Sequence, residues 1–69
     1  MPVGTVKFFN TVSGFGVIEP DGGSNDAFVD ISAVQRAGLV DLHEGHRIQY
    51  DLEPGRDSKS AAENLVAMD

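Results

Sequence analysis

The chain contains no cysteine and no tryptophan among its 69 residues. Without cysteine it can form neither a disulfide nor a thiolate metal site, which excludes the small scaffolds that depend on such staples. A chain of this length is near the lower limit of what a hydrophobic core can stabilise alone, and no second domain fits. We therefore predict a single domain over residues 1–69, held by a compact core as in a cytoplasmic protein.

Long hydrophobic runs are also absent. The longest uninterrupted apolar stretch is only a few residues, far short of the roughly 20 residues that cross a bilayer. The first residues, Met1–Thr5, lead directly into strand-like sequence without a basic start or a cleavage site of small residues. We therefore expect neither membrane insertion nor a secretion signal.

Positive charge is scarce. Five lysines and arginines stand against eleven aspartates and glutamates, which gives a net charge of −6. This balance argues against a protein that coats polyanions through electrostatics. Any binding of nucleic acid must be short-range and led by stacking, while most of the acids fit solvated turns and alternating strand positions.

Glycine and proline interrupt the sequence at short intervals, and the segments between them are rich in Val, Ile, Phe and Thr. Such segments are too short for helices and are typical of strands. The pattern predicts five strands, at 5–10, 14–19, 27–30, 46–53 and 61–68. Between the third and fourth strands it predicts one helical turn at 31–36, capped by Ser32, and a long loop at 37–45. A polar turn at 54–60 precedes the last strand.

Five such strands would leave exposed edges in a flat sheet, whereas closure into a small barrel removes the edges and encloses the apolar residues. We therefore predict an all-β fold with a five-stranded barrel. The residues expected to fill its interior are Val6, Ile18, Val29, Ile48, Tyr50, Leu52 and Leu65.

Four of the five aromatic residues lie in three short segments, Lys7–Asn10, Ser13–Ile18 and Ala27–Asp30. Glycines on both sides of Phe15 remove neighbouring side-chain bulk, so that a flat partner can approach the ring. A nucleobase is the commonest flat partner that also tolerates sequence variation. The cluster therefore predicts binding of single-stranded nucleic acid.

The order and spacing of these motifs resemble the bacterial cold-shock domain, an antiparallel Greek-key barrel of the OB-fold type. The resemblance covers the whole chain and is carried by Gly4–Asn10, Gly14–Gly16 with Ile18, Phe28–Val29, Ser32–Ala33, Gly38, Leu42–Gly45 and Ala61–Leu65. It implies a protein that binds single-stranded RNA or DNA with little sequence demand and acts as an RNA chaperone, with no enzymatic activity, cofactor or small-molecule substrate.

The resemblance also implies roles for individual residues. Lys7 would contact a phosphate, Phe9 would support the aromatic face, and Asn10 would make polar contacts at its rim. The rings that would stack on successive bases are Phe8, Phe15 and Phe28, with Val17 and Asp30 on the same face. Peripheral contacts are expected from Ile31, Leu39, Arg56 and Lys59.

Six face positions depart from the family pattern. The family usually has Trp at Phe8, Lys at Ser13, Phe at Val17, His at Asp30, Phe at Ile31 and often Phe at Leu39. If each lost stack or cation costs roughly 1–3 kcal/mol, two losses weaken binding by about 30-fold to 10⁴-fold. We therefore expect weakened affinity.

The sequence leaves two questions open: whether the phenylalanines are exposed or buried, and which role Asp30 has. The phenylalanines can instead fill the core, because alternation places Phe15 and Val17 on one face and Ile18 on the other without saying which face is wet. Asp30 can cap the helical turn that follows it, or it can repel the nucleic acid.

A competing function is a protein-interaction barrel that has largely lost nucleic-acid binding, which the net charge and the changes at Ser13, Val17 and Asp30 motivate. Catalysis has no credible set of residues. His43 and His46 are three apart but lie in a predicted loop without cysteine, so we expect no metal site. A monomer is expected, with a strand-swapped dimer as the alternative.

Overall fold

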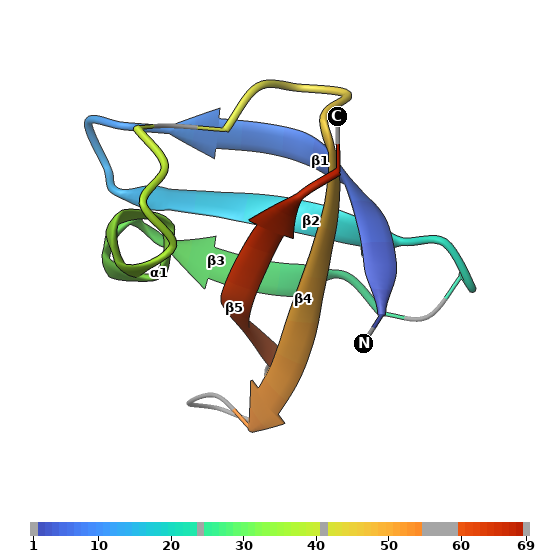
Figure 1. Cartoon of the computed structure of the whole chain (residues 1–69). Helices are drawn as coiled ribbons and strands as arrows, with labels where there is room; N and C mark the ends of the chain where they lie inside the picture. The colour runs from blue at the N-terminus through green and yellow to red at the C-terminus, as the bar shows by residue number, and fades with distance from the viewer. Residues whose placement is uncertain (1, 24, 41, 55–59, 69) are drawn as a thin grey trace.

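The computed structural model describes residues 2–23, 25–40, 42–54 and 60–68. In chain order the elements are β1 (Val3–Asn10), β2 (Phe15–Pro20), β3 (Ala27–Asp30), α1 (Ile31–Arg36), β4 (Arg47–Pro54) and β5 (Ser60–Ala67), as Figure 1 shows. The predicted third strand and helical turn match these bounds, and the other strands match to within two residues at each end. Most of the predicted polar turn lies outside the described residues.

The strands close into a barrel in the order β1-β2-β3-β5-β4, which confirms the predicted fold class. Four of the neighbouring pairs are antiparallel, and the fifth, between β3 and β5, is parallel and pairs Phe28 with Ala61. Directions around a closed ring can alternate throughout only when the number of strands is even. A five-stranded barrel therefore needs one parallel pair.

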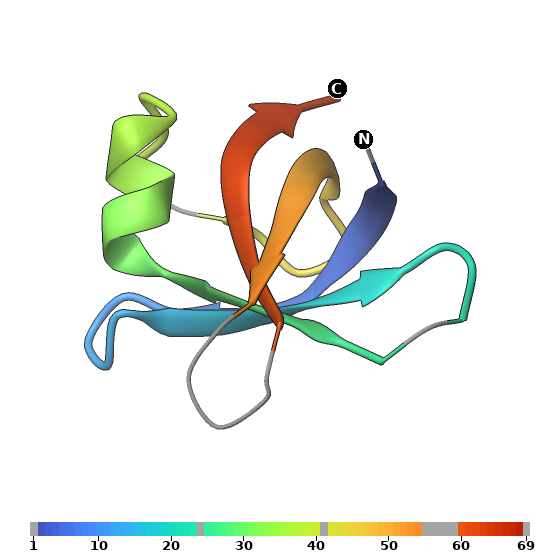
Figure 2. The same cartoon turned by 90° about the horizontal axis from the view of Figure 1, so that it is seen from below.

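The barrel is built from two groups of strands. In Figure 2, β4 and β5 cross over the sheet formed by β1, β2 and β3, and α1 lies at one end. The helix contributes Ala33 and Val34 to the interior, where they join buried residues from all five strands and Leu42 of the following loop. These strand residues are Val6, Ile18, Ala27, Val29, Ile48, Tyr50, Ala62 and Leu65.

The predicted core is confirmed at six of its seven positions, and the prediction for Leu52 is wrong. Its side chain is 46% exposed, although Ile48 and Tyr50 on the same strand are fully buried. Leu52 lies near the end of β4, where Glu53 is exposed as well. Alternation predicted the face of the strand but not the point at which the core ends.

The prediction that Ser32 caps the helical turn is also wrong. Helix α1 begins at Ile31, so the residue in the cap position is Asp30, whose Oδ1 accepts from the Ala33 backbone N–H at 3.0 Å. The Ser32 hydroxyl donates to the same oxygen at 2.9 Å. Of the two roles considered for Asp30, the capping role is thus confirmed, and repulsion of nucleic acid stays a prediction.

In the part of the chain that the structure describes, no helix is long and apolar enough to cross a membrane. The same residues hold no group of three or more His, Cys, Asp or Glu side chains placed to bind a metal ion.

Candidate nucleic-acid interface

Three phenylalanines from three neighbouring strands form a row on the outside of the barrel. The Phe15 and Phe28 rings are stacked, with centroids 5.4 Å apart and planes inclined by 23°, and Phe8 meets Phe15 edge-on at 6.0 Å and 62°. Phe8 is 46% and Phe15 38% exposed, while Phe28 is half-buried. We call Phe8, Phe15 and Phe28 the aromatic row.

A β-bulge in β1 turns Phe8 outward. Val6 pairs with Ile18 and Phe8 pairs with Val17, so one extra residue, Lys7, is inserted in β1 between the two pairs. Regular alternation would place Phe8 on the same face as Val6, inside the barrel. The insertion reverses the faces, as bulges do, so Phe8 joins the row and Phe9 packs against the core instead.

Glycine at position 16 makes room for the inward ring. It pairs with Phe9 across the strands, and a Cβ at this position would lie 2.5 Å from Cδ1 of Phe9 and 2.6 Å from the Phe8 carbonyl oxygen. Only glycine tolerates such close approach of a ring and a neighbouring backbone. Gly16 therefore serves the packing of Phe9, whereas the access to Phe15 expected from the sequence stays a prediction.

Val17 lies between Phe8 and Phe28 on the outer face, but its side chain is almost fully covered. It pairs with Phe8 on one side and with Phe28 on the other, so it shares their face of the sheet. It is only 7% exposed, yet it does not belong to the interior core cluster. Its contribution in this state is to support the neighbouring rings.

Lys7 stands beside the row and has an acidic partner that the sequence did not indicate. Its Nζ lies 3.3 Å from Oδ2 of Asp26, in the connection between β2 and β3, and both side chains are substantially exposed. The other two basic residues in the described ranges are also paired, Arg36 with Glu63 and Arg47 with Asp21. Lys7 thus already has a carboxylate partner in this structure.

Asp30 brings a negative charge to the end of the row. The hydrogen bond from the Ala33 backbone lowers the pKa of its carboxyl group, with further lowering from the Ser32 hydroxyl and the Arg36 guanidinium, while partial burial opposes them. The carboxylate therefore stays ionised at neutral pH.

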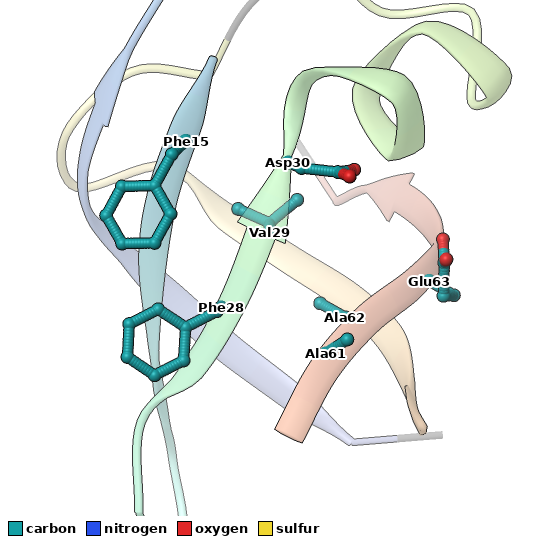
Figure 3. Close-up of a pocket in the computed structure, with 7 residues that line it drawn as sticks. All are labelled: Phe15, Phe28, Val29, Asp30, Ala61, Ala62 and Glu63. Carbon is teal, nitrogen blue, oxygen red and sulfur yellow. The ribbon is translucent and has the colours of Figure 1, made fainter. Parts of the chain in front are cut away.

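A pocket of ≈ 140 Å³ adjoins the row, between β3 and β5 (Figure 3). Glu63 forms part of its wall and accepts two hydrogen bonds from Arg36 of α1, at 2.9 and 2.8 Å. The full lining is Phe15, Phe28, Val29, Asp30, Ala61, Ala62 and Glu63. Nothing in the sequence indicated that β5 residues belong to this site, because only the parallel pairing brings them next to β3.

The other residues predicted to contact nucleic acid, where the structure describes them, make contacts within the protein itself. Asn10 Oδ1 accepts from the backbone N–H groups of Val12 at 2.8 Å and Ser13 at 3.2 Å, which orders the turn between β1 and β2. Leu39 packs against the core, and Ile31 is half-buried. Arg56 and Lys59 lie outside the described residues.

Residues 3–68 match the family model of the 'Cold-shock' DNA-binding domain. The chain belongs to the cold-shock domain family. It is 56% identical over 68 residues to a "probable cold shock protein" of Sinorhizobium fredii, with 97% of this chain and 99% of the relative covered. It is 50% identical to cold shock protein CspA of Rhizobium meliloti over the same shares. For the cold shock-like protein CspE of Escherichia coli the identity is 45%, over 94% of this chain and 93% of the relative.

These matches confirm the resemblance seen in the sequence. Cold-shock domain proteins bind single-stranded nucleic acids and are not enzymes. That the aromatic row is where such binding takes place on this barrel stays a prediction.

Proposed function

We propose that this chain binds single-stranded RNA or DNA through the aromatic row and acts as an RNA chaperone in the cytoplasm. The observation that supports the proposal best is the row itself, three rings from adjacent strands held side by side on an outer face. Bases of any sequence can stack on such rings, because every base has an aromatic face.

The mechanism is mass action. Rings that stack on unpaired bases stabilise the open strand relative to its paired forms, so the protein shifts the equilibrium of a transcript towards the unpaired state. Contacts that are weak and rapidly reversible let the protein leave before it blocks translation. No cofactor or energy source is required.

We propose further that the affinity is modest. Val17 supplies no ring of its own, Asp30 adds a negative charge at the end of the row, and Lys7 must leave Asp26 to reach a phosphate. The net charge of −6 gives no long-range attraction to a polyanion. Stacking must therefore supply most of the binding free energy.

An amide-resolved NMR titration with a short pyrimidine-rich single strand at low salt tests the proposal. We expect shifts at 7–10, 14–17 and 28–30, where the row and its support lie. If no amide shifts even at high strand concentration, the barrel does not bind nucleic acid, and the alternative of a protein-interaction module takes its place.

A further inference from the structure

The pocket beside the aromatic row opens where two strands separate. β3 and β5 pair at Phe28 and Ala61, and beyond that pair Asp30 of β3 and Glu63 of β5 form parts of the pocket wall. Figure 3 shows the Asp30 side chain extending from β3 in the direction of β5. The pocket lining thus combines two phenylalanines, a valine, two alanines and two carboxylates.

The size of the pocket suits a single aromatic ring. Its ≈ 140 Å³ is several times the roughly 30 Å³ that one water molecule occupies. It is smaller than the roughly 300 Å³ at which pockets for whole small molecules begin. A pyrimidine base therefore fits the space better than a two-ring purine.

The polar groups at the rim are hydrogen-bond acceptors. The Ser32 hydroxyl and the Ala33 backbone N–H both donate to Oδ1 of Asp30, and Asp30 lines the pocket, so Oδ2 is the better candidate to accept from a ligand. Glu63 is held by Arg36 through both of its oxygens. Of the two carboxylates in the lining, that of Asp30 is therefore the one with an oxygen left for a ligand.

We propose that this pocket selects cytosine over uracil or thymine, with the cytosine N4 amino group donating a hydrogen bond to Asp30 Oδ2. The proposal rests on the function proposed above and adds a base preference to it. Asp30 acts here as a residue that determines specificity.

The reason lies in the hydrogen-bonding edges of the pyrimidine bases. Cytosine presents an amino donor at position 4, which Asp and Glu side chains accept, whereas uracil and thymine present a carbonyl oxygen at the same position. A carbonyl placed against a carboxylate brings two acceptors together and leaves both without the hydrogen bonds that water provided. One such contact, at a partly exposed rim, should give a preference of about 5-fold.

Fluorescence anisotropy with labelled six-nucleotide strands of dC and of dT measures the preference directly. We expect the dC strand to bind about 5-fold more tightly. The Asp30→Asn variant should reduce or reverse this preference, because asparagine caps a helix as well as aspartate does but places an amide donor where Oδ2 was. Glu44→Gln removes the same charge from an exposed turn ahead of β4 and is the matched control; its preference should equal that of the wild type.

The outcomes separate the two proposals. If neither strand binds, the proposed function fails, and the base preference with it. If both bind but dT binds as tightly as dC, or if Asp30→Asn leaves a dC preference unchanged, the function stands and the role of Asp30 is overturned. A thermal melt of Asp30→Asn close to that of the wild type shows that the cap is retained.

Discussion

Val6 and Phe8 lie two residues apart on β1, yet they occupy opposite faces of the sheet. Val6 is 1% exposed in the core, and Phe8 is 46% exposed on the outside. The extra residue between their cross-strand partners accounts for the reversal. The outward position of Phe8 in the aromatic row therefore depends on the bulge at Lys7.

The bulge predicts that truncations of the two adjacent rings have different effects. Phe8→Ala should weaken binding of a single strand by about 5- to 150-fold, since it removes one stacking surface, and should leave the melting temperature nearly unchanged. Phe9→Ala should instead lower the stability by about 2 kcal/mol or more, or about 8 °C or more in melting temperature, because that ring packs against the core.

Circular dichroism melts and anisotropy titrations of both variants check this difference. Phe8→Leu is the control for Phe8→Ala, since it keeps an apolar side chain but removes the ring. Equal losses of stability in Phe8→Ala and Phe9→Ala would contradict the reversal of faces.

The barrel could be predicted from the sequence because the patterns that indicate its strands and turns involve residues close together in the chain. The turn residues, the alternation within strands and the helical turn after Asp30 each depend on neighbours in the chain. What the sequence did not predict came from contacts between distant segments or from shifts in register. Three features arise in this way: the bulge at Lys7, the Lys7–Asp26 ion pair, and the parallel pairing of β3 with β5 that brings Glu63 to the pocket.

The aromatic residues illustrate the same division. Their clustering was visible in the sequence, but alternation could not say whether Phe8 or Phe9 lies outside, because one inserted residue exchanges the two. The resemblance to a family supplied that choice. Leu52 shows the reverse case, in which correct alternation did not reveal where the core ends.

Release of Lys7 from its partner should strengthen binding. Asp26→Asn leaves the ammonium group free to meet a phosphate, and an exposed ion pair is worth only about 0–1 kcal/mol, so we expect a gain of up to about 5-fold with little change in stability. The variant also reduces the net negative charge, which by itself favours a polyanion. A double-mutant cycle with Lys7→Gln, measured by anisotropy, separates the two effects.

In that cycle, Asp26→Asn should give almost no gain when Lys7 is absent. Lys7→Gln alone should reduce the slope of log K against log salt by about 0.7, as expected for one phosphate contact on a single strand. A gain from Asp26→Asn that persists in the Lys7→Gln background would show that net charge, rather than the ion pair, controls the affinity.

Restoration of the residues that the family usually carries should have separable effects. Val17→Phe should strengthen binding by about 5-fold or more, because a ring at this position would lie between Phe8 and Phe28 and extend the row. Ser13→Lys should steepen the salt dependence by about 0.7 if the new cation meets a phosphate. Titrations over a range of salt concentrations measure both, and unchanged affinity in Val17→Phe would count against the row as the binding surface.

The cap at Asp30 makes the stability of the domain depend on pH. Its pKa is lowered in the folded state, chiefly by the Ala33 backbone hydrogen bond, so the carboxylate stabilises the fold at any pH above the unfolded value of about 3.9. As the pH falls from that value through the lower folded pKa, the carboxylate is protonated and the stabilisation is lost. Asparagine keeps the cap without titrating, so the Asp30→Asn variant should lack this part of the acid destabilisation.

Thermal melts between pH 7 and pH 2.5 measure the effect as the difference in melting temperature between wild type and Asp30→Asn. The difference should be constant above about pH 5 and should shift in favour of the variant at lower pH. Asp30→Ala serves as the uncapped reference and should be less stable than the wild type by about 1 kcal/mol at neutral pH. If the difference between wild type and Asp30→Asn does not vary with pH, the carboxylate has the same pKa in the folded and unfolded chains. The charge of Asp30 would then contribute nothing to the stabilisation by the cap.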